Sequence, residues 1–289
     1  MAYFYVLLLT FLFSFGGIMI KSSGMMFSSF MISFLRFAIG VALLLIIDLV
    51  KYKRIRISFA SGLILLGGAA KAVNYLLENY GVMKGFSYGN VIVWPVQAIA
   101  ALIAGALLFH EKMHLKNVIG AILCVTGISI VSLNGADLSG LAGGQAALLP
   151  VFIGAGIGAA TFTICQKMLI DRIHTVESNL SMFLIGGAIC LFPAVGSADP
   201  VRGPVSMQAL IAVFTLGAIT GIGFLLQAEA LKKIPVFVVT MIQSSSVILT
   251  LLWAVLIYHE PVTRFIVAGT CLFLCGMLLI NLKIGRSHA

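Results

Sequence analysis

Long apolar stretches follow one another along almost the whole chain, and this feature limits the fold more than any other. Ten of them approach the length of about 20 helical residues that crosses the hydrocarbon core of a bilayer. The predicted spans are roughly 3–20, 30–50, 59–82, 87–109, 118–133, 148–167, 179–195, 206–228, 236–258 and 265–282. Charged residues make up 9% of the chain, against about 25% in a soluble domain. Such a chain needs lipid as its solvent, so we expect an all-α membrane protein of ten transmembrane helices.

The basic residues lie in short runs between the apolar stretches. If the N-terminus is cytoplasmic, twelve of the 18 Lys and Arg residues fall in inside loops or the C-terminal tail, four fall in outside loops, and two lie within spans. Cytoplasmic loops carry an excess of Lys and Arg, so the pattern predicts cytoplasmic N- and C-termini in a multi-pass protein of the plasma membrane. The net charge of +9 is dispersed among these loops and forms no basic domain. This distribution favours the lipid bilayer as a partner and excludes nucleic acid.

The chain contains an internal repeat. His110-Glu111 closes the fourth apolar run and His259-Glu260 closes the ninth, 149 residues later. The same offset aligns Leu76-Leu77 with Leu225-Leu226, Gly120 with Gly269, and Gly127 with Gly276. We therefore predict two units, 1–140 and 141–289, of five helices each. Because five is odd, the second unit enters the membrane inverted, and inverted repeats are the architecture of alternating-access carriers.

Several motifs carry a family resemblance. They are Phe15-Gly-Gly-Ile-Met-Ile-Lys21, then Ser33-Phe-Leu-Arg36-Phe37, and in the second half Leu225-Leu-Gln-Ala-Glu-Ala-Leu-Lys232-Lys233. Over nearly its whole length the chain resembles the EamA branch of the drug/metabolite transporter superfamily. The resemblance implies two inverted five-helix repeats around a cavity lined mainly by helices 1, 3, 4, 6, 8 and 9. It implies a secondary carrier of a small metabolite, amino acid or drug-like solute, with no cofactor; proton coupling and a homodimer are compatible with it.

One face of the predicted third helix carries three polar residues. Lys71, Asn74 and Glu78 are spaced i, i+3 and i+7, so they share that face. A charged side chain in hydrocarbon is costly, and we expect it to point to a cavity or a partner. The repeat aligns Glu78 with Gln227, which would face it across the cavity. Glu78 is also the candidate proton-coupling residue, unless it lies near the outer interface beside Lys84.

Further polar and aromatic residues are candidates for the same cavity. Trp94, Gln97 and Tyr75 could supply an aromatic wall and an orienting amide, although aromatic residues at helical spacing serve equally well as packing. The repeat adds Gln243 and Ser244, in the region equivalent to Trp94 and Pro95. Arg36, early in the second helix, is expected to extend toward the outer interface.

Two other function classes remain open. His110-Glu111-Lys-Met-His114 spells the H-E-x-x-H signature of zinc peptidases, in which two histidines on one helix face bind the metal. The equivalent His259-Glu260-Pro-Val-Thr263 lacks the second histidine, and no third ligand is evident. We therefore expect no metal site and no enzyme. A channel is the other alternative, which the lack of a filter-like polar loop disfavours.

Overall fold

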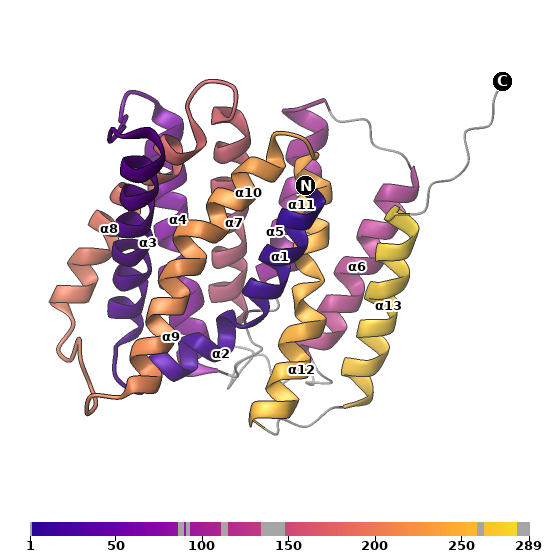
Figure 1. Cartoon of the computed structure of the whole chain (residues 1–289). Helices are drawn as coiled ribbons and strands as arrows, with labels where there is room; N and C mark the ends of the chain where they lie inside the picture. The colour runs from indigo at the N-terminus through magenta and orange to yellow at the C-terminus, as the bar shows by residue number, and fades with distance from the viewer. Residues whose placement is uncertain are drawn as a thin grey trace.

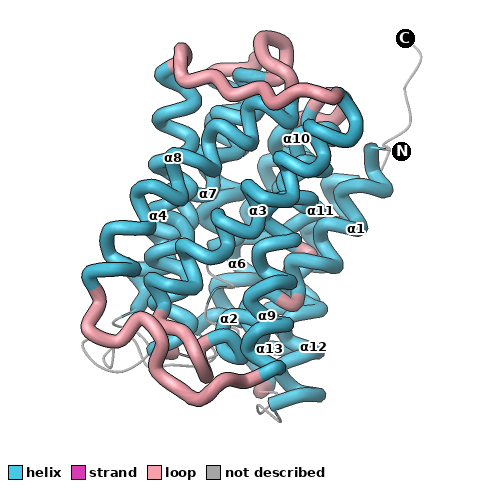
Figure 2. Tube along the Cα trace, turned by 60° about the vertical axis from the view of Figure 1, so that its left-hand side comes forward, coloured by secondary structure: helices cyan, strands magenta, loops and turns pink. Residues whose placement is uncertain are grey.

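Helices make up the regular structure of the chain (Figure 1). The computed structural model describes residues 2–85, 90, 93–110, 115–133, 148–258 and 263–281. The helices are α1 (Ala2–Ser14), α2 (Gly16–Ser23), α3 (Ser29–Tyr52), α4 (Gly62–Lys84), α5 (Val93–Leu107), α6 (Leu115–Leu133), α7 (Leu149–Leu169), α8 (Thr175–Gly196), α9 (Met207–Ala218), η4 (Ile219–Gly223), α10 (Phe224–Leu231), α11 (Val236–Ser244), α12 (Ser246–Tyr258) and α13 (Arg264–Asn281). Element η4 is one π-helical turn. The loops gather at the two ends of the bundle (Figure 2).

Within the described residues, six helical stretches are long and apolar enough to cross a membrane. They are Ala2–Ser23, Ser29–Tyr52, Leu149–Leu169, Thr175–Gly196, Met207–Leu231 and Val236–Trp253. Shorter apolar helices cover Val93–Leu107, Val118–Val131 and Arg264–Gly276. Helix α4 has 23 residues but is less apolar, because its buried face carries charged and amide side chains. The ten predicted runs thus correspond to ten helices, three of them interrupted, and the prediction of an all-α multi-pass membrane protein is confirmed.

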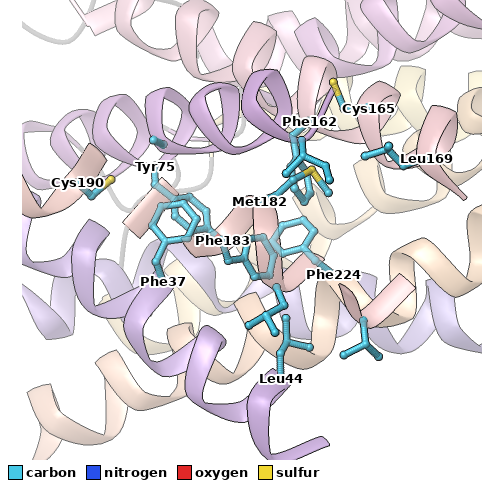
Figure 3. Close-up of a cluster of buried hydrophobic side chains, with 14 residues drawn as sticks. Phe37, Leu44, Tyr75, Phe162, Cys165, Leu169, Met182, Phe183, Cys190 and Phe224 are labelled. Atoms are coloured by element: carbon cyan, nitrogen blue, oxygen red, sulfur yellow. The ribbon is translucent and has the colours of Figure 1, made fainter. Parts of the chain in front are cut away.

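A cluster of aromatic rings joins five helices in one half of the bundle (Figure 3). The ring of Phe37 in α3 lies 5.0 Å from that of Tyr75 in α4. Phe183 in α8 lies 5.8 Å from both Phe37 and Phe162 of α7. Phe224 in α10 meets Phe162 edge-on at 5.2 Å. Offset and edge-on ring pairs of this kind add stability beyond their buried area, so this cluster fixes the helices that surround the polar site.

Glycines allow several helices to touch through their backbones. A Cβ added at Gly158 of α7 would lie 2.6 Å from the carbonyl oxygen of Ala70 in α4. A Cβ added at Gly127 of α6 would lie 2.5 Å from the carbonyl oxygen of Gly269 in α13. Helices α6 and α13 lie side by side at one edge of the bundle (Figure 1). Such close approach is how small residues hold helices together in a membrane.

Segments from distant parts of the sequence meet at both ends of the bundle. At the end that carries the α2–α3 loop, an antiparallel bridge joins Phe27 to Val201. At the opposite end, the ring of Tyr52 lies edge-on to the imidazole of His174, with centroids 4.7 Å apart. Burial, with the positive charge of Arg56, lowers the pKa of His174. Its imidazole is therefore neutral at pH 7 and packs as an aromatic ring.

Candidate functional site

A small cavity lies between the helices, level with the middle of α4. Its volume is about 40 Å³, enough for a few water molecules at about 10–15 Å³ each. Its lining side chains come from helices of both halves of the chain. They are Phe13, Gly16, Arg36, Lys71, Asn74, Tyr75, Glu78, Asn90, Val93, Trp94, Gln97, Ala159, Thr163, Leu216, Ile219, Phe224 and Gln227.

Seven of the nine residues predicted for a solute cavity line the cavity described above. They are Lys71, Asn74, Tyr75, Glu78, Trp94, Gln97 and Gln227. Gln243 lies one contact away, where its Nε2 donates a hydrogen bond to Gln227 Oε1 at 2.9 Å. The Ser244 hydroxyl donates to the carbonyl oxygen of Thr240 in its own helix, at 2.9 Å, and does not line the cavity. The structure therefore brings eight of these residues into one contiguous group and leaves Ser244 beside it.

Lys71 is a buried cation on the cavity wall, with 3% of its surface exposed. Its ammonium group donates to Asn74 Oδ1 at 2.8 Å, and the Asn74 amide donates to the carbonyl oxygen of Ala155 at 3.0 Å. The rings of Phe224 and Tyr75 lie 4.0 Å and 4.4 Å from Lys71 Nζ. Ring faces are negative and attract cations. Aromatic rings and one amide oxygen thus hold this ammonium inside the bundle.

Arg36 is part of the same site, which corrects the expectation that it extends toward the outer interface. Its residue surface is 5% exposed, and its guanidinium carbon lies 3.5 Å from the centre of the Tyr75 ring. Arg36 Nη1 donates to Asn79 Oδ1 at 3.0 Å, and the Asn79 amide donates to Ser33 Oγ at 2.8 Å. The position of Arg36 in the sequence indicates how deep in the membrane it lies, but not whether its side chain points toward lipid or toward the other helices. Helix α3 turns it inward, where α4 supplies its partners.

Glu78 faces the cavity between a cation and an amide. Its Oε2 lies 3.9 Å from Arg36 Nη1, and its side chain is 13% exposed. The Asn90 amide donates to Glu78 Oε1 at 3.1 Å. Lys84, the residue beside which Glu78 would lie at the outer interface, is exposed at the end of α4. The structure therefore places Glu78 at the cavity.

A chain of buried amides forms the other side of the cavity. Gln227 Nε2 lies within hydrogen-bond distance of Thr163 Oγ1 at 3.1 Å and of Gln166 Oε1 at 2.8 Å. Gln97 Nε2 also donates to Thr163 Oγ1, at 3.2 Å. Gln243 Oε1, at the end of this chain, is buried without a hydrogen-bond partner. A partly paired buried network holds its members less firmly than a fully paired one, so the α11 end is the less firmly held end of this row of amides.

The π-helical turn η4 lies against the cavity. Thr220 within it forms a hydrogen bond of 2.8 Å between its hydroxyl and that of Tyr75. On its other side, a Cβ added at Gly221 would lie 2.9 Å from the carbonyl oxygen of Gly40. Single π turns inside α-helices are frequent at functional sites. Here the turn sets Thr220 toward α4 and brings the backbone onto α3.

Two interrupted helices pack against each other near the cavity. Helix α1 ends at Ser14, so the Ser14 carbonyl lacks its helical partner and instead accepts a hydrogen bond of 3.2 Å from Thr250 Oγ1. The Trp253 indole donates to Ser14 Oγ at 2.9 Å. Both partners come from α12, which itself begins after an interruption at Ser245. Within a membrane, such breaks are tolerated where protein groups satisfy the freed backbone.

The metallopeptidase alternative gains no support from the described residues. His110 lies after the end of α5 and has a φ of 49°, in the left-handed region, so it is not on a helix. Residues 111–114 and 259–262, which complete the two related motifs, lie outside the described residues. No group of three or more His, Cys, Asp or Glu side chains in the described part of the chain could hold a metal ion.

Several polar residues of the site do not follow from the sequence, among them Arg36, Asn90 and Thr163 on the cavity wall and Thr220, which is hydrogen-bonded to Tyr75. Threonines are common in transmembrane helices because they bond their own backbone, as Thr163 Oγ1 does to the carbonyl oxygen of Ala159 at 3.0 Å. For Thr220 the internal repeat offers a signal, because Thr220 occupies the position equivalent to Lys71, which was predicted to face the cavity.

The fold and this cavity define a multi-pass α-helical membrane protein with a buried, charged site between its helices. Comparison with known protein families identifies the class of membrane protein. The model of the EamA-like transporter family matches residues 1–133 and 147–282. The chain belongs to the EamA-like transporter family and is a membrane transporter, as its sequence motifs predicted.

Individual relatives agree with this assignment. An "Uncharacterized transporter" of Archaeoglobus fulgidus is 24% identical over 270 residues, which cover 91% of this chain and 92% of the relative. The "Uncharacterized transporter YojE" of Bacillus subtilis is 21% identical over 190 residues, covering 66% of this chain and 60% of the relative. A solved crystal structure of a protein 18% identical in sequence superimposes with a TM-score of 0.76, over 97% of this chain and 98% of its own. At that identity the likeness concerns the fold alone.

Proposed function

We propose that this protein is a secondary carrier that moves a small solute by alternating access, with the buried cavity as its solute site. The observation that carries the proposal is the cavity itself, which charged and amide side chains from both halves of the chain line together. Intramembrane ionisable residues are costly and mark solute or ion pathways. The interrupted helices α1–α2 and α11–α12 add support, because discontinuous helices form the sites of many carriers.

The proposal includes two inverted repeats, residues 1–140 and 141–289. The family model matches the chain twice, and an offset of 149 residues carries each helix of the first half onto a helix of the second. Thus α6, at 115–133, corresponds to 264–282, and α13 spans Arg264–Asn281. Helix α4 corresponds in the same way to the interrupted helix α9–η4–α10.

Reciprocal contacts support a two-fold relation between the repeats. Across a two-fold axis, if residue i touches the equivalent of j, then j touches the equivalent of i. At the offset of 149, Lys71 is equivalent to Thr220, and Tyr75 to Phe224. Lys71 lies 4.0 Å from the Phe224 ring, and Thr220 is hydrogen-bonded to Tyr75 at 2.8 Å. The two contacts form the pair that such an axis requires.

The contacts at the two ends of the bundle correspond approximately. The bridge between Phe27 and Val201 closes one end, and the ring pair of Tyr52 and His174 lies at the other. At the offset of 149, Tyr52 is equivalent to Val201, and Phe27 is equivalent to Val176, two residues after His174. Alternating access requires the two ends to open in turn around a fixed site, so these two contacts are the candidates for the closing surfaces.

A labelling experiment tests alternating access. In a variant with its five native cysteines replaced, Ala159→Cys places one thiol on the cavity wall. We expect a membrane-impermeant thiol reagent to modify this thiol from either side of the membrane, because the cavity opens to each side in turn. The control Ala42→Cys, on the exposed outer face of α3, should resist the reagent from both sides. Modification of Ala159→Cys from one side only would contradict the proposal.

The orientation belongs to the proposal as well. We infer cytoplasmic N- and C-termini in the plasma membrane, because one end of the bundle carries most of the Lys and Arg residues. Arg54→Cys on that end should be protected from an impermeant reagent in intact cells, and Asp199→Cys on the opposite end should be labelled. External labelling at position 54 would reverse the orientation.

A further inference from the structure

The charges on the cavity wall do not cancel. Two cations and one carboxylate line the cavity among the described residues. The carboxylate of Glu78 lies 3.9 Å from Arg36, whereas Lys71 has no carboxylate within ion-pair distance in the described part of the chain. The formal charge of the lining is therefore +1. A buried charge without a counter-charge is costly, so a solute that supplied one negative charge would be bound preferentially.

The ammonium group of Lys71 has hydrogen-bonding capacity left for such a solute. It carries three N–H donors, and one of them reaches Asn74 Oδ1 at 2.8 Å. Its other neighbours are the rings of Phe224, Tyr75 and Phe162, at 4.0, 4.4 and 5.2 Å. Rings attract the cation but offer no oxygen acceptor. Two N–H groups thus remain for the oxygens of a ligand.

The charge also lies on one side of the site. The charged lining residues Arg36, Lys71 and Glu78 all belong to the first repeat. At the offset of 149 their equivalents are Ile185, Thr220 and Gln227, none of which is charged. A solute that fits this arrangement has one charged end and one neutral end.

We propose that the solute is a small organic monocarboxylate, whose carboxylate binds the Lys71 ammonium and whose neutral end faces Gln227. This inference rests on the proposed function and names its solute class. A monoanion neutralises the lining charge of +1, whereas a zwitterion, a neutral amide or an amine does not. The cavity volume of about 40 Å³ favours a solute of few heavy atoms.

Four probes of one carbon skeleton test the charge requirement at pH 7: lactate, lactamide, 1-aminopropan-2-ol and alanine. They are respectively an anion, a neutral molecule, a cation and a zwitterion. By titration calorimetry on the purified protein, lactate should bind at least about tenfold more tightly than any other probe, the lower end of what one charge-assisted hydrogen bond contributes. Equal or tighter binding of lactamide or alanine, or no binding of lactate, would overturn the proposal.

Two lysine variants on α4 assign the preference to one side chain. Lys71→Met keeps the length and apolar stem of the side chain but removes the charge, and should weaken lactate binding about tenfold or more while leaving lactamide binding within about twofold. Lys84→Met, at the exposed end of the same helix, should change neither. If Lys71→Met retains the wild-type ratio of lactate to lactamide affinity, Lys71 is not the anion site.

Uptake into liposomes distinguishes failure of the proposed anion site from failure of the proposed carrier function, on which the anion site rests. Counterflow of labelled lactate, corrected for protein-free liposomes, should depend on wild-type protein. Binding of lactate without protein-dependent uptake would leave the anion site standing and contradict the carrier function. Uptake of lactamide or alanine at the rate of lactate would leave the carrier standing and contradict the anion site.

Discussion

Substituting valine for Gly127 is expected to lower the unfolding temperature of the purified protein by on the order of 5 °C. The reason is the backbone contact between α6 and α13, where an added Cβ would lie 2.5 Å from the carbonyl oxygen of Gly269 and 2.6 Å from the Phe273 nitrogen. Backbone atoms cannot rotate away as a side chain can, so the helices must separate. Overpacking of this kind costs about 1–3 kcal/mol. Intrinsic fluorescence during heating in detergent measures the effect.

The matched control is Gly62→Val, at the first turn of α4, where an added Cβ meets nothing within 4 Å. It should leave the unfolding temperature nearly unchanged. The converse substitution Gly269→Val should act like Gly127→Val, because its Cβ would meet the carbonyl oxygen of Gly127. Once one valine has separated the helices, the second should cost less, so the double variant should be less destabilised than the sum. Additive losses would mean that the two glycines do not share one contact.

Helical periodicity was enough to predict the polar face of α4. Lys71, Asn74 and Glu78 are three and four residues apart, and in a membrane a stripe of polar groups has to point away from lipid. The repeat then identified Gln227 as the residue on the other side, and both line the cavity. Spacing and the cost of exposing charge to lipid are properties of the chain itself, which is why these residues could be predicted without the structure.

The rest of the site depends on how the helices are rotated and where they are interrupted. On α3, Arg36 shares its face with Ser33, three residues earlier, and one small hydroxyl side chain is too weak a signal to show that this face turns inward. The interruptions after Ser14 and at Ser245 lie within predicted spans, the first beside Gly16-Gly17 and the second in the polar run Gln243–Ser246. Their compensating hydrogen bonds come from residues over 200 positions apart, as between Thr250 and Ser14. The π turn that directs Thr220 toward Tyr75 likewise depends on its packing against Gly40. Such breaks follow from tertiary contacts, which the local sequence does not specify.

Glu78 is the group that we propose to couple the solute to the proton gradient. Its carboxylate lines the cavity, 3.9 Å from Arg36, and its equivalent in the second repeat, Gln227, cannot titrate. Protonation would cancel the Glu78 charge and leave Arg36 without its anion. A monocarboxylate would then bind more tightly, so proton and solute would favour each other's binding, as reciprocal coupling requires.

The substitution Glu78→Gln imitates the protonated acid and should abolish this coupling. A gradient of one pH unit drives lactate toward about tenfold accumulation if one proton moves with each solute, and free diffusion of lactic acid has the same limit, so the measured quantity is the initial rate. In wild-type liposomes the initial rate of uptake driven by the pH gradient should exceed the protein-free rate. In the variant it should fall to the protein-free rate, while counterflow exchange continues because the cavity still binds solute. The control Asp171→Asn, in an exposed loop, should take up lactate at the wild-type rate. If the pH gradient drives uptake by Glu78→Gln at the wild-type rate, the coupling proton is carried elsewhere, and Glu78 serves only to position Arg36.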